Sequence, residues 1–203
     1  MRIDQKYIEW KKWEENFGVC SKINKKYFEK EINKHSILLK EKTIAHEIGF
    51  GDGSFMRYAK DKGWEITGTE INELLIKKAT HANYKVSLSE NIKHLEDGKY
   101  DIIVAFDVLE HLEKDEIIII FAEAWKKLKH GGAFKARFPN GDSFLSMPLQ
   151  NADITHKTSI GSGMANYLAR SSGYREVMID GQVMPILCGS MRHTLHRALA
   201  WPI

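Results

Sequence analysis

The chain has 203 residues, of which 43% are hydrophobic and 28% charged, a composition that suits one globular domain with a buried core. Its 30 basic and 27 acidic side chains leave a net charge of +3, too weak a field to favour nucleic acid or an anionic membrane as a partner. Cys20 and Cys188 have neither zinc-type spacing nor a disulfide framework. Because no apolar run reaches the roughly 20 residues of a membrane span and no signal peptide is evident, we expect a cytoplasmic protein.

The first 40 residues predict a helical segment. Aromatic side chains recur among lysines and glutamates at spacings of three and four, as in amphipathic helices. Two interpretations remain open: the aromatics pack against the side of the domain, or residues 1–40 form a lid over a cleft. These aromatics are Tyr7, Trp10, Trp13, Phe17, Tyr27 and Phe28.

The stretch Thr43–Gly53, TIAHEIGFGDG, predicts a buried parallel strand that runs into a glycine-rich loop. Glycines two apart let the backbone turn sharply and approach a ligand closely. A nicotinamide-binding loop would carry a glycine where this chain has Ser54, which argues against a dinucleotide. The pattern acid-x-Gly-x-Gly-x-Gly instead resembles the first motif of class I S-adenosylmethionine (SAM) methyltransferases.

That resemblance implies a cofactor site at the end of the first strand. Glu47 would face the methionine ammonium of SAM. The backbone that follows would make room for the rest of the cofactor, at Gly49, Phe50, Gly51 and Gly53.

Two further elements extend this cofactor site. Residues 54–61 predict a helix that Gly63 ends, and residues 64–69 a second strand that stops at Glu70. An acid at this strand tip, about 20 residues beyond the glycine loop, can accept hydrogen bonds from both ribose hydroxyls. We therefore expect Glu70 and Ile71 to bind the adenosine, the alternative being a surface acid at a strand end.

A helix over residues 71–79 and a third strand over 84–88 come next. The resemblance implies that the polar step Ser89, Glu90 and Asn91 lies against the adenine edge. A helix start capped by Ser89 would explain the same letters.

The run Tyr100–Phe106, YDIIVAF, predicts a central strand covered on both faces. With the residues after it, FDVLEHL, it resembles ubiquinone-type and related methyltransferases, which implies that the carbonyl of Phe106 and the neighbouring Asp107 face the cofactor. Ligands bind open α/β sheets beyond the carboxyl ends of the strands, and Glu110 and His111 lie there as well.

Residues 115–129 predict a helix, with Ile117, Ile118, Phe121, Trp125 and Leu128 on its buried side, and residues 133–138 a fifth strand. The long polar segment 139–160 is expected to bind something. Its letters PNGDS and DITH resemble methyltransferases encoded with polysaccharide and glycan enzymes. A helix over 162–172 and a hairpin of strands 174–179 and 183–187 complete the pattern.

The alternation of strands and helices predicts an α/β fold. With the family resemblance, it indicates a Rossmann-like, doubly wound, mostly parallel seven-stranded sheet with an antiparallel C-terminal hairpin. We divide the chain into an N-terminal helical lid segment (1–40), a SAM-binding domain (41–190) and a C-terminal tail (191–203).

Methylation of a hydroxyl requires removal of its proton, and histidine is the side chain whose ordinary pKa suits that task. His156 and His111 are the candidate bases, although either can be structural. The set Asp107, Glu110, His111 and His156 also resembles the divalent-metal site of small-RNA 2′-O-methyltransferases and some quinone enzymes, and such ligands suit an ion that acidifies a hydroxyl.

The sequence therefore predicts a SAM-dependent methyltransferase that O-methylates a sugar or glycan precursor, releasing S-adenosylhomocysteine. Two alternatives remain: a quinone-like or other small-molecule acceptor, and a SAM-binding module without catalysis. The charge distribution does not favour nucleic acid, and the sequence leaves the oligomeric state open.

Overall fold

A computed structural model describes residues 5–11, 13, 17–34, 39 and 42–181. Its strands form one sheet in the order β3-β2-β1-β4-β5, and all neighbours are parallel. The order reverses between β1 and β4, which is where open α/β sheets form a ligand crevice. The strands are β1 Ile44–Ile48, β2 Glu65–Glu70, β3 Lys85–Leu88, β4 Tyr100–Phe106 and β5 Leu128–Arg137.

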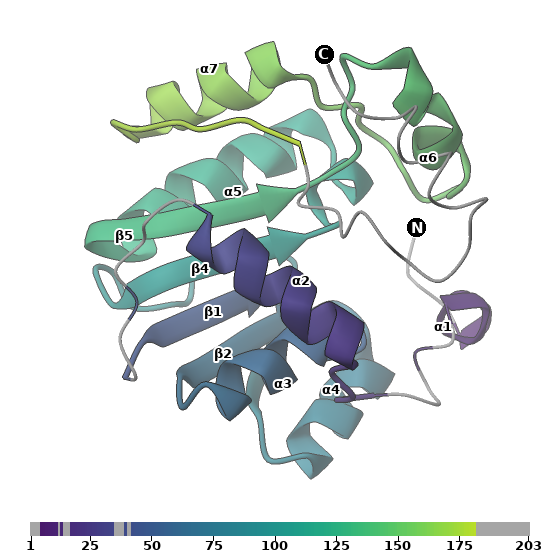
Figure 1. The fold of residues 1–203 in the computed structure, drawn as a ribbon, viewed down its shortest axis with the longest axis vertical. Helices are drawn as coiled ribbons and strands as arrows, with labels where there is room; N and C mark the ends of the chain where they lie inside the picture. Colours follow the sequence, from purple (N-terminus) through teal and green to yellow (C-terminus); the bar gives the residue numbers. More distant parts are fainter. Residues whose placement is uncertain (1–4, 12, 14–16, 35–38, 40–41, 182–203) are drawn as a thin grey trace.

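Helices cover both faces of this sheet. Figure 1 shows α2 crossing one face and α5 lying on the other, with α1 and α6 on the side toward which the strand arrows point. The helices are α1 Gln5–Lys11, α2 Lys22–Asn33, α3 Ser54–Asp61, α4 Glu73–His81, α5 Lys114–Lys127, α6 Met147–Asn151 and α7 Ser162–Ser172, with short 3-10 turns η1 Leu109–His111 and η2 Phe144–Ser146.

Two apolar clusters, one on each face, hold the layers together. On the first face, Phe28 of α2 meets Phe55 of α3 at 5.2 Å and Phe106 of β4 at 5.7 Å between ring centroids. On the second face, α5 and α7 pack together over β4 and β5. Ile118 and Trp125 of α5, expected on its buried side, are about half exposed because they lie on the outer side of that helix.

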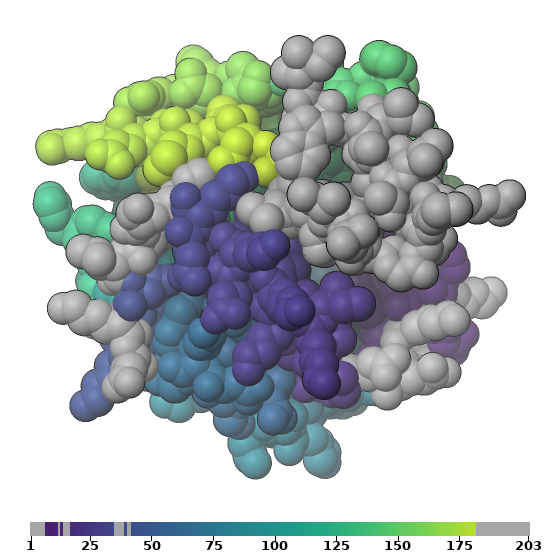
Figure 2. All heavy atoms as spheres, in the orientation of Figure 1, coloured from purple at the N-terminus to yellow at the C-terminus, as the bar shows by residue number. Residues whose placement is uncertain are grey.

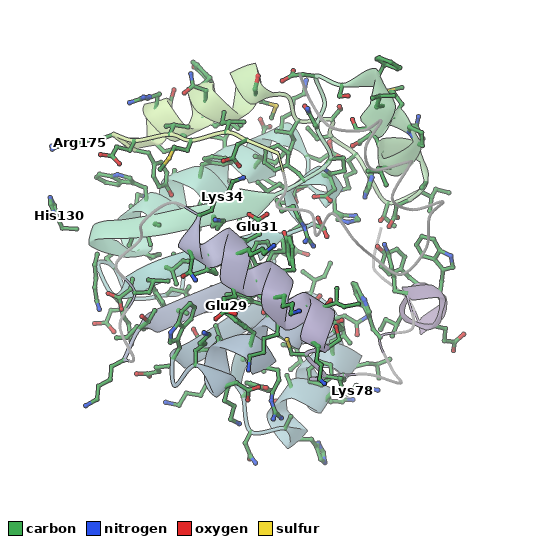
Figure 3. All side chains as sticks on the ribbon, in the orientation of Figure 1. Glu29, Glu31, Lys34, Lys78, His130 and Arg175 are labelled. Carbon is green, nitrogen blue, oxygen red and sulfur yellow. The ribbon has the colours of Figure 1, made fainter. Side chains whose placement is uncertain are left out.

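The N-terminal helix α2 is anchored at its C-terminal end. Figure 2 shows α2 on the surface, below the yellow-green residues near position 180, where Lys34 Nζ lies 2.5 Å from Asp180 Oδ1. Figure 3 labels Glu31 and Lys34 at this end of the helix, and Glu31 pairs with Lys135 of β5 at 3.9 Å. Helix α2 therefore packs against the side of the domain. For this helix, the packing interpretation of the sequence agrees with the structure.

The predicted seven strands and antiparallel hairpin are not confirmed. Residues 174–179 form no strand within the described part of the chain, and residues 183–187 and the tail lie outside it. Instead of pairing with β5, the segment packs the Tyr174 ring against Phe134 of that strand and is held by Lys34, whose Nζ donates to the Gly181 carbonyl at 2.6 Å. Of the helices in the described ranges, none is both long and apolar enough to span a bilayer.

Candidate active site

The glycine loop follows β1 directly. Gly49 has φ +62°, and a Cβ at this position would lie 2.7 Å from Val108 Cγ2, so the loop and the residues after β4 approach each other too closely for a side chain. Aromatic rings from the N-terminal segment reach the same loop. Phe17 lies 3.1 Å from where a Cβ of Gly53 would be, and Trp13 lies 3.4 Å from that of Gly51.

Glu47 carries the clearest sign of an absent ligand. Its side chain is buried, and within the described residues Oε2 has no hydrogen-bond partner. Burial, together with the nearby Asp52 and Glu70, raises the pKa of this carboxyl well above its ordinary value. Because a buried carboxylate oxygen without a donor is unfavourable, a cationic donor such as the ammonium of SAM fits here. The cofactor that the sequence implies is thus compatible with these residues.

Glu70 lies at the tip of β2, as expected. Its Oε2 accepts from the Gly51 amide at 3.1 Å, and its Oε1 accepts from the amides of Ile71 and Asn72 at 2.8 and 3.2 Å. Burial raises the pKa of this carboxyl against the effect of those three hydrogen bonds. Glu70 therefore joins the glycine loop to the start of α4, and the exposed Ile71 stands beside it.

The polar step after β3 is a turn. The Ser89 amide donates to the Glu70 carbonyl at 3.0 Å, and the Ser89 hydroxyl donates to the Asn91 carbonyl at 2.6 Å. Glu90 is exposed. Since no helix begins here, the interpretation of Ser89 as a helix cap is wrong, and the step is tied through Glu70 to the predicted adenosine site.

Asp107, which follows β4, belongs to the predicted metal set but is not grouped with its other three residues in the structure. Its backbone has φ +56°, and its carboxylate accepts from Arg137 Nε at 2.7 Å. The Arg137 guanidinium also lies over the rings of Tyr27 and Phe106, 5.0 and 5.4 Å from their centroids. This ion pair ties the Asp107 carboxylate to Arg137, the last residue of β5.

The other three residues of that set do come together. The rings of His111 and His156 meet edge to face, with centroids 4.7 Å apart. Glu110 is buried, its Oε1 lies 4.0 Å from His156 Nε2, and its Oε2 has no hydrogen-bond partner in the described ranges. One ligand atom from each of the three lies within 4.8 Å of the others. A carboxylate and two imidazoles suit a divalent transition metal in kind.

Backbone hydrogen bonds bring the two histidines together. The segment from Asn140 to Ile160 is closed at its base by a parallel bridge between these two residues. Its far part returns to η1, where the amides of Lys157 and Thr158 both donate to the Glu110 carbonyl, at 2.8 and 3.1 Å. The predicted irregular loop is thus an excursion, containing η2 and α6, that carries His156 to His111.

Burial sets the protonation states in this cluster. It raises the pKa of Glu110 to about 8, with the charge of Asp107 adding to the effect. It lowers the pKa of His111, and the neighbouring His156 lowers it further. At neutral pH, His111 is therefore an uncharged imidazole that can accept a proton.

Sequence reasoning missed three residues of this region. Arg137 holds Asp107, while Tyr7 and Lys11 of α1 both reach Asp153 Oδ2 at 2.8 Å. No local spacing could have found these contacts, because each joins residues of distant segments of the chain.

Comparisons with known proteins agree with this geometry. Residues 46–135 match a family model described as a methyltransferase domain. A SAM-dependent methyltransferase from Archaeoglobus fulgidus has the same fold, with a TM-score of 0.71 and 23% identity over 94% of this chain and 89% of that one. Residues 46–135 are thus similar to a methyltransferase domain, and the chain has the Rossmann-like α/β fold of that solved methyltransferase, with a parallel five-stranded sheet.

Two curated relatives are longer proteins. A sterol 24-C-methyltransferase of Gibberella zeae is 25% identical over 191 residues, 83% of this chain and 48% of the relative. A ubiquinone biosynthesis O-methyltransferase of Hydrogenovibrio crunogenus is 30% identical over 130 residues, 59% of this chain and 52% of the relative. The chain spans about half the length of these relatives, and neither is described as acting on a glycan.

Proposed function

We propose that the methyltransferase domain of this chain transfers the methyl group of SAM to a hydroxyl oxygen of a small molecule. The observation that carries this proposal is the position of the two histidines. His111 follows β4 three residues after Val108, which lies against the glycine loop at Gly49, and the His156 ring packs against His111. A hydroxyl held at these two histidines would therefore lie beside the cofactor crevice.

When bound, SAM supplies an electrophilic methyl carbon, and the protein has to align the acceptor and take its proton. His156 Nδ1 lies 2.9 Å from the Gln150 carbonyl oxygen, which can only accept, so Nδ1 carries the proton and Nε2 is the basic nitrogen. In the proposed reaction the acceptor oxygen forms a bond to the methyl carbon, the carbon–sulfur bond breaks, and the hydroxyl proton moves to a histidine Nε2. The products are a methyl ether and S-adenosylhomocysteine.

The Asn140–Ile160 excursion bears on the class of acceptor. It exposes several large apolar side chains, with Phe144 81% and Ile154 85% exposed, and Leu145, Met147 and Leu149 also accessible. Such a surface beside the histidines favours an acceptor with an apolar body. We therefore propose a quinone-like or other phenolic hydroxyl first, a choice that also agrees with the ubiquinone biosynthesis relative. A sugar or glycan hydroxyl, suggested by the letters PNGDS and DITH of this excursion, is the second candidate.

The segment that carries Trp13 and Phe17 is proposed as part of the lid. Both rings lie against the glycine loop, so they would cover the cofactor and exclude water from it. In this proposal α2 is the fixed support, and α1, Trp13 and Phe17 are the cover.

A divalent cation at Glu110, His111 and His156 is the alternative to a histidine base. When bound, such an ion would lower the pKa of an acceptor hydroxyl. The unpartnered oxygen of Glu110 supports it, and the pairing of Asp107 with Arg137 leaves three candidate ligands among the described residues.

Calorimetric titration of the purified chain with SAM, S-adenosylhomocysteine and NAD tests the cofactor. Saturable binding of the first two without the third is expected, and Glu70→Ala should weaken it because three backbone amides lose their acceptor. A folded protein that binds neither SAM nor S-adenosylhomocysteine would leave the domain without the proposed activity.

Transfer of labelled methyl groups to catechols and to nucleotide sugars then tests the acceptor. We expect His156→Ala to keep SAM affinity and to lower turnover by about 10²-fold or more, as for loss of a general base. The matched control is His130→Ala, because Figure 3 shows His130 projecting from the opposite end of the sheet. Unchanged turnover in His156→Ala would remove this residue from the mechanism.

A further inference from the structure

A chain of hydrogen bonds runs from His111 away from the proposed reaction site. The hydroxyl oxygen of Thr155 lies 2.8 Å from His111 Nδ1 and 2.6 Å from Asp153 Oδ1. The Thr155 amide donates to the same Asp153 oxygen at 3.0 Å. Asp153 and Thr155 are two residues apart on the excursion, whereas His111 belongs to η1, so the contact joins two separate segments.

The direction of the protons in this chain follows from Asp153. Its side chain is buried, and the second oxygen, Oδ2, receives the Tyr7 hydroxyl and the Lys11 ammonium, each at 2.8 Å. Burial alone would raise the pKa of this carboxyl, but hydrogen bonds from Lys11, Thr155 and Tyr7 outweigh it and hold the pKa below its ordinary value. Asp153 is therefore a carboxylate, which can only accept.

A threonine hydroxyl has a single proton to donate. Because that proton goes to the Asp153 carboxylate, the Thr155 oxygen must accept a hydrogen bond from His111 Nδ1–H. His111 is then left with an unprotonated Nε2, the same arrangement that the Gln150 carbonyl imposes on His156. Each imidazole thus has an unprotonated Nε2, and the centroids of the two rings lie 4.7 Å apart.

We infer that Asp153 and Thr155 are positioning residues that hold His111 in the Nδ1–H tautomer, and that α1 completes their hydrogen-bonded chain through Tyr7 and Lys11. A fixed tautomer matters because the other form would place a proton on the nitrogen that has to receive one. The catalytic consequence of this inference rests on the proposed function, but the tautomer itself does not.

The hydrogen-bonded chain that ends at His111 depends on helix α1 of the N-terminal segment. Tyr7 and Lys11 are four residues apart, so they project from one face of the helix toward the same carboxylate oxygen. The Lys11 ammonium also lies 4.7 Å from the centroid of the Trp10 ring. A few residues later, Trp13 and Phe17 reach the glycine loop. Tyr7 and Lys11 therefore contact the hydrogen-bonded chain that ends at His111, while Trp13 and Phe17 lie against the glycine loop.

The tautomer can be measured directly by ¹⁵N NMR of the imidazole nitrogens in the full chain, kept free of metal with chelator. The chain has nine histidines, and the spectrum of His111→Gln identifies the signals of His111. We expect wild-type His111 to show a protonated Nδ1 and an unprotonated Nε2. A wild-type spectrum with the proton on Nε2 would overturn the inference without requiring any variant of Thr155.

Variants separate positioning from packing. Thr155→Val removes the hydroxyl at constant shape and should release the Nε2–H tautomer, while Thr155→Ser should retain Nδ1–H. Thr158→Val is the matched control, because it loses a buried hydroxyl of the same excursion whose bond goes to the Leu112 carbonyl at 2.7 Å. If Thr155→Val and Thr158→Val leave His111 in the same tautomer, the hydrogen-bonded chain does not control it.

Kinetics adds the functional test. Thr155→Val should lower kcat about tenfold or more while leaving the SAM affinity and the KM of the acceptor within about twofold, and Thr155→Ser should recover most of kcat. Lys11→Met should give a smaller loss of kcat, because Tyr7 still holds Asp153. A fixed tautomer in a protein that methylates no hydroxyl would keep this inference and reject the proposed function.

Discussion

His46 makes the stability of the strand that leads into the glycine loop depend on pH. The imidazole is fully buried in β1, with Nδ1 2.8 Å from Thr67 Oγ1 and Nε2 3.3 Å from Thr69 Oγ1 on β2. Burial, helped by the charge of His94, lowers the pKa of His46 from 6.5 to about 3. Below pH 6.5, His46 therefore binds a proton in the unfolded chain but stays neutral in the folded chain, so acid favours unfolding.

The magnitude follows from the width of that interval. Each pH unit between the two pKa values is equivalent to about 1.4 kcal/mol, so the stabilisation present above pH 6.5 is lost progressively toward pH 3. Between pH 7.5 and pH 5, we expect His46 to lower the free energy of unfolding by about 2 kcal/mol. That is a substantial part of the roughly 5–15 kcal/mol by which a domain is stable.

Urea unfolding followed by circular dichroism at pH 7.5, 6 and 5 measures this effect in wild type and in His46→Gln. The variant is less stable at every pH because its packing is altered, but its unfolding free energy should fall by about 2 kcal/mol less than that of wild type across this range. His130→Gln, at an exposed position, should follow wild type. Parallel pH profiles for wild type and His46→Gln would refute the reasoning.

Three further changes test the fold and the site. Gly49→Ala should weaken SAM binding at least tenfold in calorimetry, because its Cβ would meet Val108 at 2.7 Å, whereas Gly98→Ala, at a similar φ with no described heavy atom within 4 Å, should leave the affinity unchanged. Phe28→Ala should cost about 3–5 kcal/mol in urea unfolding, as for other buried aromatics, and a loss under 1 kcal/mol would mean that α2 does not depend on this ring. Added Mn²⁺ or Zn²⁺ should raise the melting temperature of chelator-treated protein and leave Glu110→Gln unchanged, and equal shifts in both would exclude Glu110 as a ligand.

Much of the fold could be predicted from local pattern. The helices at 54–61 and 162–172 and the strand at 100–106 have the predicted bounds, because glycines punctuate the helices and continuous apolar character marks a strand buried on both faces. The fifth strand starts earlier than predicted, at Leu128, since Leu128 to Gly132 continue directly from α5 and the strand register shifts beside Tyr100. The polar and glycine-rich sequence from Leu128 to Gly132 did not indicate a strand.

In the candidate site, too, features set by local sequence could be predicted, whereas contacts between distant segments could not. The positions of Glu47, Glu70 and the glycines could be predicted because a motif at a strand end fixes its own surroundings, and their binding of SAM stays a prediction. The pairing of Asp107 with Arg137, and of Lys11 with Asp153, depends on which distant segments the fold brings together, and periodicity reports burial rather than partners. For that reason the predicted metal set includes Asp107, which the structure pairs with Arg137, and the contacts of Asp153 with Tyr7 and Lys11 were missed.

The closed base of the Asn140–Ile160 excursion has a consequence for divergence within such enzymes. Its two ends meet at one bridge, so they are separated by about the spacing of neighbouring strands, ~5 Å. Segments anchored in this way can change length with little entropic penalty and without moving β5 or α7. Exchange of residues 144–149 between homologues would replace most of the exposed apolar side chains of this segment while leaving Asp153, Thr155 and His156 in place. Under the proposed function, the range of acceptors could thus change through one short segment.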